Sequence, residues 1–182
     1  MRKMFILKDG TPLVVREATY NDAVILIPLL RRIFQTSSEV LTTVGEFQKE
    51  DTLEAQLQRI KHFSEAPGKC LFVAEMGNAL VGTIDFWNGH RQRIAHTGEF
   101  GMGVLPECRD KGIGKCLLET LLEWAKGNPL IEKVKLGVFA SNARAIHLYK
   151  KMGFIEEGRK TNEIKMESGE YFDVIEMYQI VK

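Results

Sequence analysis

A short basic turn joins a strand to an amphipathic helix in the segment VLPECRDKGIGKCLLETLLEWA, and no other feature constrains the chain as strongly. The strand ends near Val104, and the helix is expected over Ile113 to Lys126. Unpaired N–H groups at a helix start present roughly half a positive charge to an anion. Gly112 and Gly114 have no Cβ, so an anion can approach their main chain closely. The segment therefore predicts an anion site.

Side chains around this turn add to its positive charge, because Arg109, Lys111 and Lys115 lie within it. Competing phosphate motifs fit less well. A P-loop would require glycine in place of Arg109 and Ser or Thr in place of Cys116. In a dinucleotide fingerprint the third small residue would fall on Leu117. A tight turn with a solvated basic edge remains the alternative interpretation.

The remaining pattern predicts one layered α/β (α+β) domain over residues 1–182, since no linker or repeat divides the chain. The first predicted helix carries Val24, Ile27, Leu30 and Ile33 on one face. We expect a mixed sheet with antiparallel pairing over most of it. In chain order the predicted elements are a hairpin over 4–18, a helix capped by Thr19, a loop from Thr36 to Lys49, a helix over 52–63, strands over 70–76, 79–87 and 95–105, the helix over 113–126, a strand over 134–139, a helix over 142–152 and a hairpin around Ser168-Gly169.

Composition excludes several classes of protein. Hydrophobic residues make up 45% and charged residues 27% of the 182 residues, which is typical of a globular chain. A formal net charge of +1 gives no global attraction to nucleic acid. No apolar run approaches the roughly 20 residues that a membrane helix needs, and the start MRKMFILKDG does not have the form of a signal peptide. Cys70, Cys108 and Cys116 lack metal-type spacing, so we expect buried free thiols in a reducing cytoplasm.

A second segment, FASNARAIHLYKKMGFIEEG, places an asparagine near a strand end and a tyrosine two turns into the next helix. With the glycine turn, it resembles the GNAT superfamily of N-acetyltransferases. The family motif Arg/Gln-x-x-Gly-x-Gly/Ala is matched by Arg109, Gly112 and Gly114. A second signature is matched by Asn142, Ala145, Tyr149, Gly153 and Phe154. The match to the family is closest from Glu99 to Lys182. Within the family, the chain most resembles the branch of spermidine/spermine and phosphinothricin-type acetyltransferases.

The resemblance implies a GNAT-like fold, with about seven strands in a mixed, mostly antiparallel sheet and four main helices on both faces. It implies acetyl-CoA as co-substrate, its pyrophosphate held in the loop from Arg109 to Gly114. The pantetheine arm would bind the strand main chain between two splayed strands, Glu99–Leu105 and Lys133–Phe139. The glycines of the first strand fit close approach of a ligand, and a β-bulge is the alternative. The cofactor-binding residues implied are Met102, Gly103, Val104, Arg109, Lys111, Gly112, Ile113, Gly114, Lys115, Asn142 and Ala145, with Met102 lining the thioester.

Two catalytic residues follow from the same resemblance. Tyr149 matches the tyrosine that protonates the departing CoA thiolate in relatives, or else it packs on the sheet as a helix residue. Glu99 is the first candidate for the base that deprotonates the acceptor, with His96 and Asp85 as rivals. A strand residue or a substrate contact is the alternative for Glu99. Asn142 either hydrogen-bonds pantetheine or caps its helix.

The resulting expectation is a cytoplasmic enzyme that moves an acetyl group from acetyl-CoA to a primary amine of a small molecule by direct attack. It would use no metal, nucleic acid or membrane, and a homodimer is left open. A protein N-terminal acetyltransferase of the ribosomal-protein type and a non-catalytic CoA-binding sensor are the alternatives. The acceptor is not identified, because the acidic residues between Thr36 and Gly68 are diluted by Lys49, Arg59, Lys61 and Lys69.

Overall fold

One eight-stranded sheet forms the centre of the computed structural model, which describes residues 1–36, 39 and 43–182. The strands are β1 (Arg2–Ile6), β2 (Pro12–Glu17), β3 (Lys69–Met76), β4 (Ala79–Asn88), β5 (Thr97–Val104), β6 (Lys133–Phe139), β7 (Ile155–Lys165) and β8 (Tyr171–Ile180). The α-helices are α1 (Ala23–Gln35), α2 (Val44–Glu50), α3 (Leu53–Glu65), α4 (Ile113–Gly127) and α5 (Ala143–Lys151). Short 3-10 helices cover Tyr20–Asp22, Gln92–Ile94 and Pro106–Cys108.

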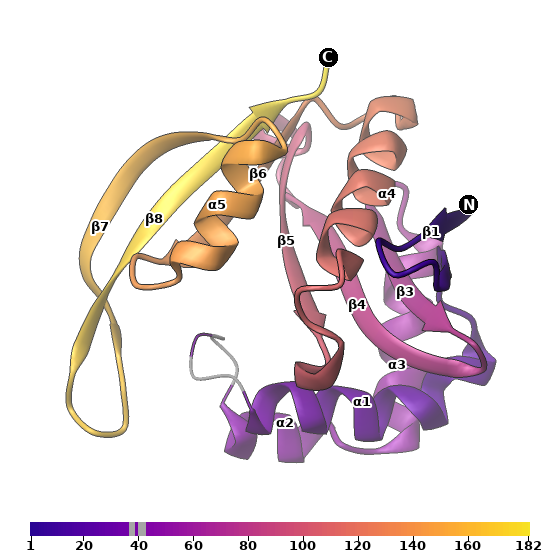
Figure 1. Cartoon of the computed structure of the whole chain (residues 1–182). Helices are drawn as coiled ribbons and strands as arrows, with labels where there is room; N and C mark the ends of the chain where they lie inside the picture. Colours follow the sequence, from indigo (N-terminus) through magenta and orange to yellow (C-terminus); the bar gives the residue numbers. More distant parts are fainter. Residues whose placement is uncertain (37–38, 40–42) are drawn as a thin grey trace.

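Tight turns close the three predicted hairpins. Gly10, Gly77 and Gly169 adopt positive φ angles of 83°, 63° and 89° between β1 and β2, β3 and β4, and β7 and β8. Glycine occupies this left-handed region without the steric cost that a Cβ imposes. These turns set the antiparallel register of each hairpin, and the β7–β8 hairpin extends away from the rest of the sheet (Figure 1).

The order of strands in the sheet is β1-β2-β3-β4-β5-β6-β8-β7, and the described pairings are antiparallel except for β5 with β6. A parallel pair needs a crossover, which α4 provides here. The β5–β6 pairing covers only Thr97↔Lys133, Gly98↔Val134 and Glu99↔Lys135. Beyond Glu99 the two strands separate, as the ribbon shows below the top of β5 (Figure 1).

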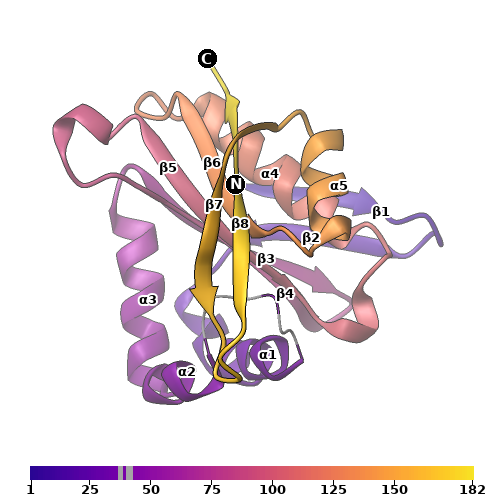
Figure 2. The ribbon, with the colours of Figure 1, turned by 90° about the vertical axis from the view of Figure 1, so that its left-hand side faces the viewer.

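Helices cover both faces of the sheet and bury a separate apolar cluster on each (Figure 2). On one face α4 contributes Leu117, Leu118 and Leu121, all 0% exposed. They pack with residues of β3 to β6 and β8 and with Tyr149 of α5. On the other face α1 and α3 bury Leu26, Leu29, Leu30, Ile33 and Ile60 against Leu71, Val73 and Leu80. The sheet thus has an α4/α5 face and an α1/α3 face.

The mostly antiparallel mixed sheet is confirmed, with eight strands where about seven were expected. The expected loop from Thr36 to Lys49 is wrong in part: α2 begins at Val44, where Thr43 and Glu46 form a capping box that starts a fifth α-helix. Residues 37–38 and 40–42 of that loop lie outside the described residues. The expected face of α1 is also wrong at Val24, which is 61% exposed, because the helix begins at Ala23 and buries Ala23 and Leu26 instead.

The glycines of β5 are explained by this chain's own side chains. A Cβ on Gly98 would lie 2.3 Å from Cζ of Phe86, and one on Gly103 would lie 2.8 Å from Cγ2 of Ile33. A Cβ on Gly101 would lie 2.9 Å from Oδ1 of Asp85. Packing against β4 and α1 therefore requires small residues here without any ligand.

We predict that Gly98→Ala destabilises the fold by about 1–3 kcal/mol, the usual cost of overpacking a filled core. The new methyl group would also lie 2.5 Å from the main-chain oxygen of Trp87, which cannot move aside as a side chain can. Gly158→Ala in β7 is the matched control, since nothing lies within 4 Å of its Cβ position. Urea unfolding of both variants measures the difference, and equal midpoints would contradict this account of Gly98.

Candidate active site

The first turn of α4 presents main-chain N–H groups that no described side chain caps. Gly112 is its N-cap residue, with φ 93° and no side chain of its own. By contrast, Thr43, Thr52 and Asn142 cap α2, α3 and α5 with side-chain oxygens. The first bond inside α4 runs from the N–H of Cys116 to the carbonyl of Gly112, at 3.1 Å. The N–H groups of residues 113–115 therefore remain to be satisfied by solvent or by an anion.

Gly112 and Gly114 differ in what surrounds them. A Cβ on Gly112 would meet nothing within 4 Å, so the approach to this turn is open. A Cβ on Gly114 would lie 3.5 Å from Leu148 of α5 and 3.6 Å from Cε of Met102 of β5. The start of α4 thus lies beside both α5 and the separated part of β5. Ile113 is 1% exposed, so its side chain belongs to the core and only its N–H is placed to face a ligand.

Basic residues around the turn play different parts. Arg109 is half-buried, and its Nε donates to the carbonyl of Val104 at 3.2 Å. Lys111 is exposed, and Lys115 forms an ion pair at 3.1 Å with Glu119 one turn further along α4. Lys111 and Lys115 therefore place positive charge at the open side of the loop, while the hydrogen bond of Arg109 connects the loop to the end of β5.

An ion pair joins the two segments that the sequence singled out. Nε of Arg144, in the first turn of α5, lies 3.1 Å from Oδ1 of Asp110. Asp110 is a non-glycine residue with a positive φ of 64°, two residues before the left-handed Gly112. Sequence reasoning missed this pair, and the only local signal for it is opposite charge in the two motifs.

Tyr149 is buried on the α4/α5 face, with 9% of its surface exposed. Its ring packs against Phe100 of β5 and against Phe154, at centroid distances of 5.8 and 6.0 Å. Burial raises the pKa of its phenol to about 12. The phenol is therefore fully protonated at neutral pH, as a proton donor must be. Packing on the sheet, the alternative for this residue, also holds.

Asn142 caps α5, since its Oδ1 accepts a hydrogen bond from the N–H of Ala145 at 3.0 Å. The cap that sequence analysis left open is thus present, and the same bond occupies the N–H of Ala145. A contact of the Asn142 amide nitrogen with pantetheine stays a prediction. The cap holds the start of α5 beside the loop that contains Asp110.

Glu99 lies on the α1/α3 face, opposite Trp87 in the register of β4 with β5. Its Oε1 is 2.8 Å from Nζ of Lys135, which stands beside it in the last paired position of β5 and β6. The rival Asp85 lies on the same face and pairs through Oδ2 with Nη2 of Arg59 of α3, at 2.6 Å. Both carboxylates thus have basic partners that sequence reasoning did not find, because the pairs join elements far apart in the chain.

His96, the other rival base, is exposed and precedes β5. Its carbonyl accepts hydrogen bonds from the N–H groups of Glu132 and Lys133, at 2.8 and 3.1 Å. These bonds place His96 at the joined end of β5 and β6, away from the separated residues of β5. The structure therefore brings Glu99 and Asp85, rather than His96, next to the separated strands.

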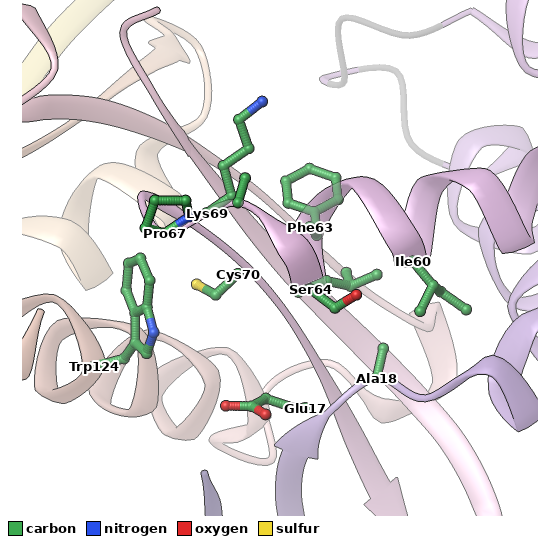
Figure 3. A pocket seen from close by; sticks show the side chains of 11 residues that line it. Glu17, Ala18, Ile60, Phe63, Ser64, Pro67, Lys69, Cys70 and Trp124 are labelled. Atoms are coloured by element: carbon green, nitrogen blue, oxygen red, sulfur yellow. The ribbon is translucent and has the colours of Figure 1, made fainter. Parts of the chain in front are cut away.

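A separate pocket of about 250 Å³ lies at the end of α3, between β3 and Trp124 of α4 (Figure 3). None of the sequence-predicted site residues lines it. Cys70, at its base, is a free and buried thiol, as are Cys108 and Cys116. Burial raises the pKa of all three thiols, so they are poor nucleophiles at neutral pH. This pocket is thus distinct from the site between the strands.

Residues 1–36, 39 and 43–182 contain no cluster of three or more His, Cys, Asp or Glu side chains suited to a metal ion. Within the same part of the chain, no helix has both the length and the apolar character needed to cross a membrane.

Comparison with known protein families finds a match over residues 29–154 to the family described as Acetyltransferase (GNAT) family. An L-amino acid N-acetyltransferase of Escherichia coli is 28% identical over 120 residues, which are 66% of this chain and 74% of that protein. A spermidine N(1)-acetyltransferase of Vibrio cholerae is 29% identical over 118 residues, which are 65% of this chain and 66% of that protein. The two relatives are named for different acceptors.

Solved structures share the fold. A GNAT-family acetyltransferase from Streptococcus pneumoniae superposes with a TM-score of 0.88 at 24% identity, covering 93% of this chain and 99% of that one. A Salmonella typhimurium protein solved with its cofactor acetyl-CoA has a TM-score of 0.82 at 18% identity, covering 93% of this chain and 94% of that one.

We predict that the Tyr149 phenol makes stability fall at alkaline pH. Its pKa rises from 10.0 to about 12 in the folded chain, so above pH 10 the unfolded chain loses this proton while the folded chain keeps it. The contribution of Tyr149 to the free energy of unfolding is therefore fully present below pH 10, and about 2–3 kcal/mol of it is lost as the pH approaches 12. The Tyr149→Phe variant lacks this hydroxyl, so its stability does not carry this loss.

Urea unfolding of wild type and Tyr149→Phe between pH 9 and 12 measures this loss as a change in their stability difference. Tyr20→Phe, at a tyrosine that is 51% exposed, is the control and should follow wild type. A stability difference between wild type and Tyr149→Phe that stays constant over this range would contradict the prediction.

Proposed function

Because the chain belongs to the acetyltransferase (GNAT) family, it is an acetyl-CoA-dependent N-acetyltransferase, and we propose that it acetylates the primary amine of a small molecule by direct attack. The observation that carries the proposal is the separation of β5 from β6 beyond Glu99, next to the uncapped start of α4. An acyl donor could thus lie along β5 with its phosphates at the loop. No acyl-enzyme is invoked, since all three cysteines are buried.

The donor would bind in three parts. Its pyrophosphate would occupy the loop from Arg109 to Gly114, beside the N–H groups of residues 113–115 and the ammonium groups of Lys111 and Lys115. Its pantetheine would hydrogen-bond the main chain of Gly103 and Val104 like an added strand. Met102, whose Cε would lie 3.6 Å from a Cβ on Gly114, would line the thioester.

The sheet would separate donor from acceptor. Successive side chains of a strand alternate between faces, so Met102 and Phe100 lie on the α4/α5 face while Glu99 and Gly101 lie on the α1/α3 face. Tyr149 contacts Phe100 and shares the α4/α5 face. The acceptor amine would therefore approach from the α1/α3 face, through the gap between β5 and β6.

Proton transfer is required on both sides of the thioester. An amine with a pKa near 10.4 is neutral about once in 2,500 molecules at pH 7, a deficit of roughly 4–5 kcal/mol. Glu99 is the proposed base, through water, with Asp85 as its rival on the same face. Tyr149 would protonate the departing thiolate. The burial that raises the phenol pKa would also raise the pKa of a thiol leaving beside it, so burial would not by itself widen the difference in acidity between the two groups.

The proposal predicts that Tyr149→Phe lowers kcat by about 10²–10⁴-fold, the usual contribution of a positioned general acid, with little change in the Kd of acetyl-CoA. CoA thiol release with a panel of small amines measures the rate, and isothermal titration measures binding. Leu148→Met on the same helix is the control and should keep the wild-type rate, because it replaces one apolar side chain beside Gly114 with another of similar volume. Full activity of Tyr149→Phe would remove this residue from the mechanism, and thiol release only with peptides would favour a protein N-terminal acetyltransferase.

Gly112→Asp should weaken binding of acetyl-CoA by at least tenfold, because it places a side chain and a negative charge at the open start of α4. Gly169→Asp is a matched control. Gly169 has nearly the same φ, 89° against 93°, and nothing within 4 Å of its Cβ position. Both substitutions carry the same backbone strain, so only their positions differ. Unchanged Kd in Gly112→Asp, measured by titration, would refute the pyrophosphate assignment.

A further inference from the structure

Three carboxylates on the α1/α3 face beside the separated strands have basic partners. Asp85 pairs with Arg59 at 2.6 Å, and Glu99 pairs with Lys135 at 2.8 Å. On β8, Glu176 lies opposite Gly137 of β6 and pairs with Lys160 of β7 at 2.8 Å. A polyamine carries several positive charges and is bound best by carboxylates that lack such partners. This face therefore suits an acceptor with no net charge better than a polycation.

Arg59 has more hydrogen-bonding capacity than its partner uses. Its Nη2 donates to Asp85, while its Nη1 is buried and has no hydrogen-bond partner in the described part of the chain. Its guanidinium lies over the ring of Phe63, 5.8 Å from the ring centre. A buried donor of a charged group without a partner is costly and calls for an acceptor. A planar guanidinium is matched in geometry by a carboxylate that engages both nitrogens.

The Arg59–Asp85 pair lies beside the segment of β5 where the thioester is proposed. Oδ1 of Asp85 would be 2.9 Å from a Cβ on Gly101, the residue before Met102. The absence of a side chain at Gly101 therefore brings the carboxylate of Asp85 against the main chain of β5. Both charges of the pair would then be close to the thioester of a donor bound along β5.

Trp87 adds an apolar surface next to this pair. It is 40% exposed, and its ring carbon Cζ3 would be 3.9 Å from a Cβ on Gly101. An exposed tryptophan beside a charged pair offers contact to an uncharged side chain of a ligand. A cation, an anion and an apolar surface thus lie together around Gly101.

We propose that the acceptor is an amino acid, or a similar small zwitterion, with an uncharged side chain. Its carboxylate binds Arg59 and supplies the missing partner of Nη1, its ammonium group binds Asp85 before deprotonation, and its side chain packs on Trp87. The inference rests on the proposed acetyl transfer and narrows its acceptor. It also chooses between the two kinds of acceptor for which the Escherichia coli and Vibrio cholerae relatives are named.

The test compares leucine with leucinol, which has the same amine and side chain without the carboxylate, and with spermidine. Wild type should prefer leucine to leucinol by about 10- to 100-fold in kcat/KM, the value of one charge-assisted hydrogen-bonded pair. Arg59→Gln should bring this ratio close to one, chiefly by raising KM for leucine. Arg59→Lys, which keeps the charge and loses the planar fork, should retain an intermediate ratio.

Two further variants distinguish a loss of carboxylate recognition from misfolding. Arg59→Gln leaves Asp85 without its partner, so the double variant Arg59→Gln/Asp85→Asn removes both charges and should also show a ratio close to one. Arg2→Gln on β1, at the far edge of the sheet, is the control and should keep the wild-type ratio.

The outcomes separate this inference from the proposed function. Thiol release with leucinol or spermidine at least as fast as with leucine overturns the zwitterion and leaves acetyl transfer to small amines standing. An unchanged leucine preference in Arg59→Gln overturns the role of Arg59. No thiol release with any of the three acceptors, with the wild-type chain folded, overturns both.

Discussion

The parting of β5 from β6 after three paired residues is the constraint on which the rest of the site depends. Two strands that stayed paired would satisfy each other's main chain and close the sheet. Parting them leaves the main chain of β5 beyond Glu99 available to another partner, which is how an extended ligand adds to a sheet. The gap between β5 and β6 also connects the two faces of the sheet, so that an acetyl donor on one face and an acceptor amine on the other could come into contact.

Packing on both faces maintains this separation. On the α4/α5 face, Phe100 of β5 contacts Tyr149, while α4 begins beside Met102. On the α1/α3 face, Ile33 of α1 fits against Gly103 closely enough that a Cβ there would clash. The far part of β5 is thus held by helices rather than by β6. At the joined end, the ion pair of Glu99 with Lys135 spans the last rung of the ladder.

Electrostatics divides the two faces in a way that matches the proposed chemistry. The α4 side offers uncapped N–H groups and lysines, which favour a polyanionic donor. The α1/α3 side offers paired charges, which favour an acceptor that is neutral overall. Each face of the sheet thus has a charge pattern that complements the substrate proposed to bind there.

Sequence alone determined what depends on neighbours in the chain. The hairpin glycines, the stripe of α4, the Asn142 cap and the glycine turn that begins α4 were predicted correctly as local structure, because turn geometry and helix periodicity act over a few residues. The glycine turn and the Asn142–Tyr149 segment together were enough to indicate acetyl-CoA. The short α2 helix was missed because Thr43 caps it inside an expected loop, and Val24 was wrongly placed on the buried face of α1, which begins only at Ala23 after a 3-10 turn.

Tertiary structure alone decided what the acceptor meets. The pairs Arg59–Asp85 and Glu99–Lys135 join residues 26 and 36 positions apart, and they exist only because α3 packs on β4 and β6 lies parallel to β5. No periodicity marks such partners, since ion pairs across elements require only proximity in space. In the sequence, Arg59 is one of several basic residues among the acidic ones; in the fold, it pairs with Asp85 while its Nη1 is buried without a hydrogen-bond partner in the described part of the chain.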